Sequence, residues 1–267
     1  MIEHFQIQEL VGQTERHVSY KAYDKQSGRK YLLKRYLIDS GMGLGRYKCW
    51  KEEFNKVIDW AMRMEMPSLQ YLAGGGFDEN DDNPYAVFEW LHSVSLGELL
   101  LRKGELDVII IMEIVESALN ALAFMHQRNL VHGNLSPDTI MFTRETNKTP
   151  WFVAWCPIRS LACRHEVNRT SLDDFTAPEV AAGEHVGPAA DLYSLGKIVR
   201  EATRSFDEQE GLDEWVLKMT AERPEDRYPS AEEALDAFDD LDLFKFELPQ
   251  FLLEKLQSSE DKQGSEG

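Results

Sequence analysis

The residues with the clearest potential for chemistry lie in one stretch, LVHGNLSPDTIMF, which spans Leu130 to Phe142. It contains an imidazole at His132, a carboxamide at Asn134 and a hydroxyl at Thr139. A carboxamide can orient a substrate hydroxyl, but it has no negative charge and cannot accept the proton of that hydroxyl. The sequence offers His132 no evident nucleophile to activate, so we interpret it as a structural residue.

Four short segments in the first third of the chain alternate apolar and polar residues, which is the pattern of half-buried strands. We predict strands at 5–10, 17–24, 30–37 and 85–90. Residues 46–64 have apolar side chains at helical spacing and are followed by Pro67, so they are predicted as a helix. The three glycines at 74–76 are interpreted as a bend or bulge between strands. The chain therefore starts with a small antiparallel sheet and one helix.

From about Ser95 onward the pattern becomes helical. Helices are predicted at 95–104, 107–129, 187–206, 211–221 and 230–241. Ser95 is a candidate N-cap of the first helix, and Ser230 with Glu233 forms a capping-box signature in the last. The segment at 107–129 is apolar on most sides, which indicates a central helix. Residues 257–267 are polar and are predicted to be disordered.

The charge of the chain limits its partners. Its 267 residues have a formal net charge of −18, and such a surface repels nucleic acid and anionic lipid. We interpret this charge as an aid to solubility in preference to an acidic docking surface, and we expect no nucleic-acid partner and no membrane partner. The apolar run at 108–119 is interrupted by Glu113 and Glu116 and is interpreted as too short to span a bilayer.

The N-terminus and the cysteines indicate the compartment. The first residues lack the basic start and apolar middle of a secretory signal, so we expect a cytoplasmic protein. The cysteines, Cys49, Cys156 and Cys163, are odd in number and show no C-x-x-C spacing. We therefore expect neither a structural zinc site nor a disulfide framework, and the thiols are interpreted as buried or incidental.

Several motifs in a fixed order resemble those of the protein kinase family, over roughly residues 5–243. HGNLSPDTI, after the long helix, is similar to the kinase catalytic loop. TAPEV at 176–180 is similar to the A-P-E segment, and DLYSLG at 191–196 is similar to the D-x-W-S-L-G helix start. RPEDRYPSAEEAL at 223–235 contains an arginine at the place of the one that pairs with the A-P-E glutamate. Compact bacterial serine/threonine kinases are the most similar members.

This resemblance implies an α+β fold with two lobes, a small antiparallel β-sheet lobe with one helix and a larger, mainly helical lobe. We place the N-terminal lobe and hinge at 1–91 and the helical lobe at 92–246. Residues 247–267 are assigned to a short apolar segment and a polar tail.

The resemblance also implies four structural residues. Glu179 and Arg227 are expected to form a salt bridge, and Asp191 is expected to bond the backbone of the VHGN loop. His132 is expected to serve in packing and hydrogen bonding.

At the positions of the family's nucleotide pocket, this chain has several residues that differ from the usual ones. The sequence GQTERHVSYKA keeps Gly12 of the glycine-rich loop, but Thr14 and His17 stand at the second and third glycine positions. Side chains there obstruct the close approach of backbone N–H groups to phosphate. Ser19 replaces the valine that packs on adenine, and Leu32 replaces a small alanine, which should partly fill the pocket.

The remaining positions equivalent to the pocket are Lys34, Glu89, Leu91 and Met141, and we assign none of the pocket residues to nucleotide binding. Lys34 stands at the place of the β3 lysine, whose usual partner is a helix glutamate. Val57 occupies that glutamate position, and Glu53 lies one turn earlier. A displaced pairing of Glu53 with Lys34 is left open.

The positions for catalysis and metal binding also differ. Asn134 stands at the catalytic aspartate, Ser136 at the loop lysine and Thr139 at the metal-binding asparagine. By register Trp155 takes the place of the D-F-G aspartate, with Cys156 and Pro157 after it. Magnesium requires hard oxygen ligands, chiefly carboxylates, and an indole has no lone pair for a metal. We therefore expect no metal, no cofactor and no catalytic residue, with Trp155 filling the cleft.

These substitutions predict a pseudokinase, a kinase fold that is not an enzyme and that acts as a protein-binding scaffold or allosteric regulator. The expected partner is a protein, for example an active kinase or another signalling protein. The surfaces proposed for it are the region around Val57 and Trp60, the cleft, and the apolar segment at 248–256. Two alternatives stay open because Gly12, Lys34 and the hinge-like FEWLH are kept: a metal-independent nucleotide sensor, and an unconventional nucleotide-using transferase with weak activity.

Overall fold

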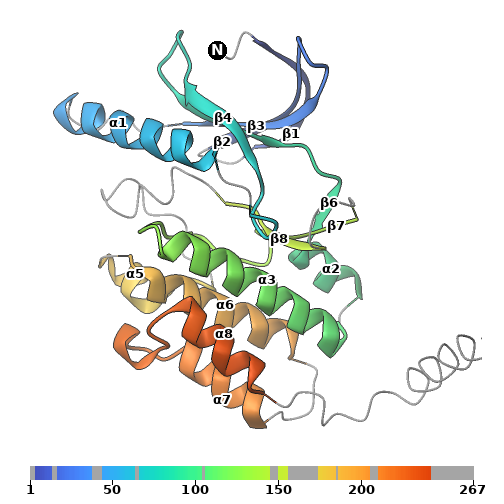
Figure 1. Cartoon of the computed structure of the whole chain (residues 1–267), viewed down its shortest axis with the longest axis vertical. Helices are drawn as coiled ribbons and strands as arrows, with labels where there is room; N and C mark the ends of the chain where they lie inside the picture. Colours follow the sequence, from blue (N-terminus) through green and yellow to red (C-terminus); the bar gives the residue numbers. More distant parts are fainter. Residues whose placement is uncertain are drawn as a thin grey trace, which may run out of the picture.

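The computed structural model describes residues 4–13, 17–37, 44–63, 66–103, 106–144, 150–155, 174–184, 186–204 and 210–241. Figure 1 shows two lobes, an upper one with a β-sheet and helix α1 and a lower one made mainly of helices. The predicted two-lobed α+β fold is thereby confirmed. β5 ends at Glu89 and β6 begins at Ser93, on either side of the boundary predicted between the lobes. The segment assigned to residues 247–267 lies outside the described residues.

The upper lobe contains one antiparallel sheet in the order β1-β2-β3-β5-β4. Its strands are β1 (Phe5–Gln13), β2 (His17–Asp24), β3 (Lys30–Tyr36), β4 (Leu72–Phe77) and β5 (Pro84–Glu89). The four predicted strands are confirmed, whereas β4 was not predicted. The sheet buries side chains on both faces, with Leu33 and Val87 in one cluster and Ala86 and Phe88 in the larger core shared with the helices.

The three glycines at 74–76 belong to strand β4, so their interpretation as a bend between strands is wrong. The pairing of β4 with β5 shifts register between Leu72 and Gly74, and a bulge therefore does lie at the start of the run. A Cβ atom on Gly75 would lie 2.7 Å from Cδ1 of Ile58 and 2.8 Å from the carbonyl oxygen of Tyr85. Glycine is required at this point because α1 packs directly on the strand.

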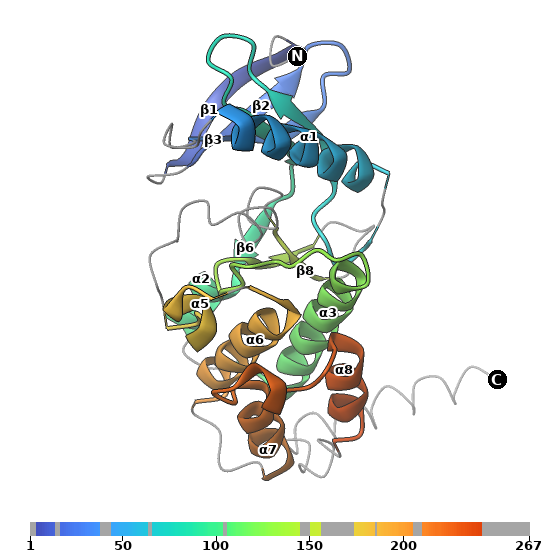
Figure 2. The same cartoon turned by 90° about the vertical axis from the view of Figure 1, so that its left-hand side faces the viewer.

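Helix α1 (Leu44–Ala61) lies across the sheet, as Figure 2 shows. Its buried residues Trp50, Phe54 and Ile58 face the strands. Phe77 of β4 meets the rings of Trp50 and Phe54 edge to face, with ring centroids 5.8 and 5.2 Å apart. The helical spacing of these apolar residues predicted the helix, and their contacts with the sheet hold it in place.

A second, three-stranded sheet lies between the large sheet and α3 (Figure 1). It consists of β6 (Ser93–Ser95), β7 (Ile140–Thr143) and β8 (Trp151–Val153), in that order and antiparallel. Strands of three or four residues give almost no periodicity signal in a sequence. This small sheet brings the segment of candidate chemistry next to the hinge.

The lower lobe contains α2 (Leu96–Lys103), α3 (Val108–His126), α5 (Pro178–Ala182), α6 (Pro188–Ala202), α7 (Glu210–Met219), the 3-10 turn η2 (Pro224–Asp226) and α8 (Ala231–Asp239). The five predicted helices are confirmed. Ser95 Oγ accepts a hydrogen bond from the Glu98 N–H, and Ser230 Oγ accepts one from the Glu233 N–H. Both serines are therefore N-caps, as the sequence predicts.

Helix α3 is the central helix of the lower lobe, packed against α6, α8 and β8. By length and composition alone it could cross a membrane, because its 18-residue window has a mean hydropathy of 1.9. The expectation that this run is too short is therefore wrong on those two criteria. Half of that window is buried inside the fold, and central helices of folded domains meet the same criteria.

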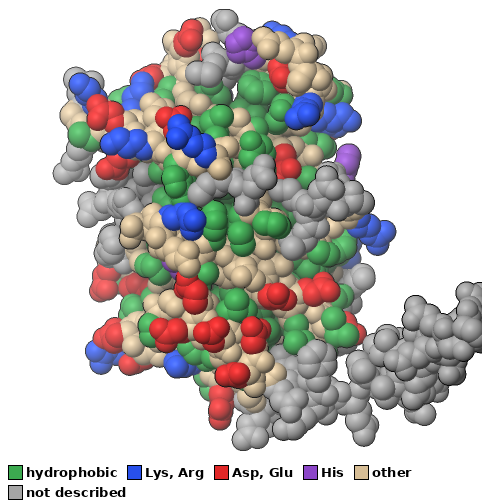
Figure 3. Space-filling model, in the orientation of Figure 1, with side chains coloured by type: hydrophobic (Ala, Val, Ile, Leu, Met, Phe, Trp, Pro, Cys, Tyr) green, Lys and Arg blue, Asp and Glu red, His purple; other side chains and the backbone are tan. Residues whose placement is uncertain are grey.

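Acidic side chains gather on the helical lobe, as Figure 3 shows for one face. Of the three cysteines, Cys49 is exposed on α1, and Cys156 and Cys163 lie outside the described residues.

Candidate catalytic and nucleotide site

Asp191, at the start of α6, organises the loop that contains the candidate chemistry. Its buried carboxylate accepts hydrogen bonds from the backbone N–H groups of His132 and Gly133, at 2.7 and 2.8 Å. These are the contacts that the kinase resemblance implies. A third donor, Nε2 of His126, lies 2.9 Å away. Sequence reasoning missed His126, because nothing in the spacing of α3 shows that its last residue faces α6.

The environment of Asp191 changes its pKa in two opposite directions. Burial raises the pKa of this carboxyl group, because desolvation disfavours its charged form. The hydrogen bond and charge of His126 and the Gly133 N–H lower the pKa more strongly. The net result is a pKa below the ordinary value, so Asp191 is a carboxylate near neutral pH.

Gly133 has a backbone φ of 68°, in the left-handed region that glycine adopts without strain. The kinase resemblance places an arginine at this position. In this chain the glycine lets the backbone turn so that its N–H reaches Asp191. The residue therefore has a conformational role that the sequence comparison did not predict.

Both ring nitrogens of His132 are engaged in hydrogen bonds that hold the loop. Nε2 donates to the carbonyl oxygen of Ala154 at 3.1 Å, and Nδ1 accepts from the Asn134 N–H at 3.3 Å. The side chain is buried. The His132 ring thus links the loop to Ala154, the residue that follows β8, and its role here is structural.

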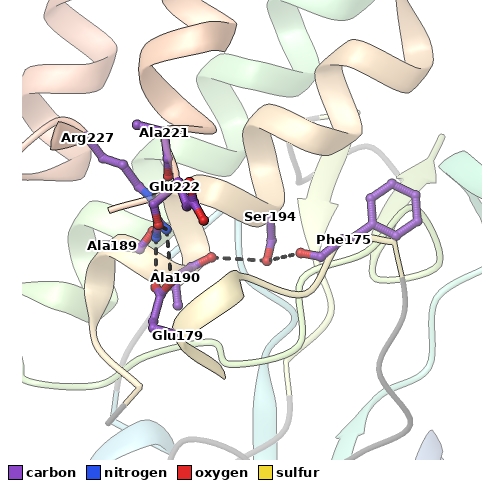
Figure 4. Close-up of polar contacts among 8 residues, drawn as sticks. All are labelled: Phe175, Glu179, Ala189, Ala190, Ser194, Ala221, Glu222 and Arg227. Carbon is purple, nitrogen blue, oxygen red and sulfur yellow. Dashed lines mark hydrogen bonds and ion pairs between the residues drawn. The ribbon is translucent and has the colours of Figure 1, made fainter. Parts of the chain in front are cut away.

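Glu179 and Arg227 form a buried ion pair, shown in Figure 4. Nη1 and Nη2 of Arg227 donate to the two carboxylate oxygens of Glu179, at 2.7 and 2.8 Å. The guanidinium also donates to three backbone carbonyl groups, those of Ala189, Ala221 and Glu222. This pair, which the resemblance also implies, joins α5 to the first turn of α6 and to the segment after α7.

Asn134 is half-buried beside a cavity of about 30 Å³, which Phe175, Thr176 and Val180 also line. Thr139 is engaged within its own turn: its Oγ1 donates to the carbonyl oxygen of Ser136 and accepts from the Ser136 N–H, at 2.9 and 3.0 Å. The hydroxyl therefore closes the loop.

Three of the positions matched to the nucleotide pocket lie in one row across the large sheet. Gly12 pairs with Ser19, and Ser19 pairs with Lys34 on the next strand. Nζ of Lys34 lies 5.4 Å from the ring centroid of Phe88. Leu32 is half-buried and pairs with the same Phe88. The fold thus brings these four pocket positions together, whereas Thr14 of the loop lies outside the described residues.

The other three pocket positions lie where the lobes connect. Oε1 of Glu89 accepts from the Tyr71 N–H at 2.9 Å, which fixes the end of β5. Leu91 is half-buried in the link between β5 and β6. Met141 lies in β7, opposite Ser95.

Trp155 is buried, with 5% of its surface exposed, and its Nε1 donates to the carbonyl oxygen of Gln70 at 3.3 Å. It lines a rear cavity of about 20 Å³ with residues from the end of α1 and the end of α3, among them Trp60 and Phe124. The residues that line this cavity include none of the seven pocket positions. The indole therefore lies in a cavity that the seven pocket residues do not line, whereas we expected it to fill the cleft.

In the part of the chain that the structure describes, no group of three or more His, Cys, Asp or Glu side chains could hold a metal ion. Cys156 and Pro157 fall outside that part. The absence of a metal site therefore stays a prediction.

The family model for the protein kinase domain matches residues 5–214. The chain belongs to the protein kinase family. Its sequence is 27% identical to the serine/threonine-protein kinase PknB of Mycolicibacterium smegmatis over 61% of the chain. It is 25% identical to a probable serine/threonine-protein kinase of Streptomyces coelicolor, SCO3848, over 80% of the chain. These matches cover 31% and 36% of the two relatives, so the chain spans about a third of their length.

Solved kinase structures share the fold. The PknI kinase domain of Mycobacterium tuberculosis superimposes with a TM-score of 0.68 at 19% identity, covering 89% of this chain and 96% of that domain. Residues 1–466 of Rad53, bound to AMP-PNP, superimpose with a TM-score of 0.69 at 18% identity, over 88% of this chain and 65% of that chain. At these identities the likeness concerns the fold alone.

One expectation from the sequence is contradicted by these relatives. We predicted that the chain is not an enzyme, and the proteins that it matches are named serine/threonine-protein kinases. The assignment as a non-enzyme is therefore wrong. It rested on three substituted positions, and residue types at a few positions do not outweigh membership of an enzyme family.

Proposed function

We propose that this chain is a serine/threonine kinase-family domain with slow phosphoryl transfer, whose main role is to bind and regulate another protein. The observation behind the proposal is the arrangement of Asn134, Thr139 and Trp155, none of which offers a carboxylate. The carboxamide can orient a hydroxyl, the Thr139 hydroxyl closes its own turn, and the indole nitrogen is bonded to Gln70.

A slow rate of phosphoryl transfer is expected for a site that positions its reactants but has no general base. A positioned base accelerates proton transfer by roughly 10²- to 10⁴-fold, and Asn134 cannot act as that base. Positioning alone still accelerates a reaction, because it removes the entropy cost of bringing the reactants together. The row of Gly12, Ser19 and Lys34 and the rigid loop under Asp191 support such positioning.

A role in regulating another protein by binding it is supported by the structural contacts of the kinase fold that this chain retains. The buried contacts of Asp191 and Arg227 fix the loop and the A-P-E segment. The end of α1 is a candidate surface: Trp60 is half-buried, and the guanidinium carbon of Arg128 lies 6.0 Å from its ring centroid. We propose a protein partner there, an active kinase or another signalling protein.

Nucleotide binding is expected to be weak, because Leu32 and Ser19 alter the pocket. With a dissociation constant of about 1 mM or above, 1 mM Mg-ATP adds no more than about 0.4 kcal/mol to stability, a melting shift of about 1 °C. Thermal denaturation with ATP, with and without magnesium, measures this shift. A shift of several degrees that needs magnesium would contradict the proposed weak site, and one without magnesium would indicate a nucleotide sensor.

Phosphoryl transfer to a generic protein substrate is expected at a rate at least about a hundredfold below that of PknB in the same assay. Changing Asn134 to Asp alone should raise the rate less than about tenfold, because Thr139 and Trp155 still occupy the two positions matched to metal ligands. The triple variant Asn134→Asp, Thr139→Asn, Trp155→Asp should raise it further.

Two lysines of β3 provide the matched control for this assay. Lys34→Met should abolish the transfer, whereas Lys30→Met, at the exposed start of the same strand, should preserve it. A rate equal to that of PknB, or full activity restored by Asn134→Asp alone, would contradict the proposal.

A further inference from the structure

The segment Ser68–Gln70, which leads from α1 into β4, is bonded directly to β8 of the small sheet. The Val153 N–H donates to the carbonyl oxygen of Ser68 at 2.8 Å, and the Gln70 N–H donates to the carbonyl oxygen of Val153 at 3.1 Å. Leu69 and Val153 thus form a parallel bridge. Part of the upper lobe therefore pairs with a strand that rests on α3 of the lower lobe.

Trp155 adds a side-chain bond to this pairing. Its Nε1 donates to the carbonyl oxygen of Gln70. Gln70 and Trp155 are both buried, with 6% and 5% of their surfaces exposed, so water competes little for the bond. The indole lines the rear cavity together with Trp60 of the upper lobe and Phe124 of the lower lobe.

The side chain of Gln70 extends the same connection to the hinge. Its Nε2 donates to the carbonyl oxygen of Glu89, the last residue of β5, at 3.3 Å. Its Oε1 is buried and has no hydrogen-bond partner among the described residues. A buried acceptor without a partner costs stability, so the other bonds of Gln70 must offset that cost.

Below Trp155 the chain is fixed to the lower lobe by a series of bonds. The Ala154 N–H donates to the carbonyl oxygen of Thr139 at 2.8 Å, and His132 Nε2 donates to the carbonyl oxygen of Ala154. His132 is in turn bonded to Asp191 of α6 through its backbone N–H. An unbroken set of hydrogen bonds therefore runs from Glu89 at the hinge, through Gln70, to α6.

We propose that Gln70 and Trp155 form an interlobe strut, which fixes the two lobes relative to one another in the absence of nucleotide and metal. The position that the kinase resemblance matches to a metal-binding aspartate would then have a mechanical role in this chain. The strut would also fix the carbonyl group of Glu89 at the hinge, since that group accepts from Gln70. This inference is independent of the rate of phosphoryl transfer.

Amide hydrogen exchange of the full chain, resolved by residue, tests the strut. Trp155→Phe removes the indole N–H and keeps most of the apolar bulk. We expect the amides of Gln70 and Val153, which join the two lobes, to exchange at least tenfold faster in this variant, relative to the amides inside α3.

Trp215 provides a matched control. It is buried as well, and its Nε1 donates to the carbonyl oxygen of Ala234 at 2.9 Å, a contact between α7 and α8 inside the lower lobe. Trp215→Phe should leave the relative exchange of the Gln70 and Val153 amides unchanged. Equal exchange in Trp155→Phe and the wild type would overturn the proposal, and so would equal acceleration by Trp215→Phe.

The wild-type chain offers a test that does not depend on the folding of a variant. With the strut in place, the exchange rates of the Gln70 and Val153 amides should lie within about tenfold of the rate of the Leu119 amide in α3. Amides in such a central helix are among the slowest to exchange. Exchange as fast as that of Gln26, in an exposed turn, would overturn the proposal.

Discussion

Replacing Arg227 with methionine is expected to lower the free energy of unfolding by about 3 to 5 kcal/mol. The side chain of Arg227 is 0% exposed and that of Glu179 is 7% exposed, so the variant leaves a buried carboxylate without its partner. Three backbone carbonyl groups lose a donor as well. Chemical denaturation of the full chain, followed by circular dichroism, measures the change.

An exposed arginine in the same segment is the control. Arg223 pairs with Glu225, but 71% and 59% of these side chains are exposed, and such pairs contribute little in water. Arg223→Met should leave the stability nearly unchanged. The double variant Glu179→Met, Arg227→Met should lose less than the sum of its single variants, because it leaves no unpaired buried charge. Stability within about 1 kcal/mol of the wild type in Arg227→Met would contradict this account.

Replacing Asp191 with alanine is expected to cost about 3 to 5 kcal/mol, because three donors lose their acceptor together. Two of them are the backbone N–H groups of His132 and Gly133, which are fixed in the loop, and the third is the ring of His126. The exposed Asp138 of the same loop is the control, and Asp138→Ala should have a small effect. A similar loss in both variants, measured by denaturation, would show that the loop is sensitive to any change of charge.

The lowered pKa of Asp191 also predicts an acid dependence. A carboxyl group whose pKa is lower in the folded state than in the unfolded state stabilises the fold fully above its unfolded pKa, ordinarily about 3.8. That stabilisation is lost as the pH falls through the lower, folded pKa. The wild type should therefore lose stability below about pH 4, and Asp191→Asn should lose less over the same range. Denaturation midpoints measured from pH 6 to pH 3 compare the two.

Much of the fold could be predicted from local signals. The alternation in β2 and β3, the helical spacing in α1, and the serine caps at Ser95 and Ser230 are properties of short segments, so they are visible without a structure. The kinase motifs added two long-range contacts, Glu179 with Arg227 and Asp191 with its loop. Both are present because a buried charge needs its partner, and the motif fixes which residues are charged.

Function was less accessible from local signals than fold. The residues Asn134, Thr139 and Trp155 led us to predict a protein that is not an enzyme, and its relatives, named serine/threonine-protein kinases, contradict that prediction. Residue types indicate which groups are present at a position. They do not give the rate at which a positioned site works, because orientation and neighbouring groups determine that rate.

The sequence by itself determined the kinase fold, the strands β1, β2, β3 and β5, most of the helices, and the charged residues that need a partner when they are buried. The tertiary structure decided the roles of three residues. Gly75 lets strand β4 pack closely on α1, His126 is the third hydrogen-bond donor to Asp191, and the Trp155 indole donates to the carbonyl oxygen of Gln70. Each of these depends on contacts between segments far apart in the chain. Such contacts leave no periodic pattern in the sequence, so they become visible only once the elements are packed together.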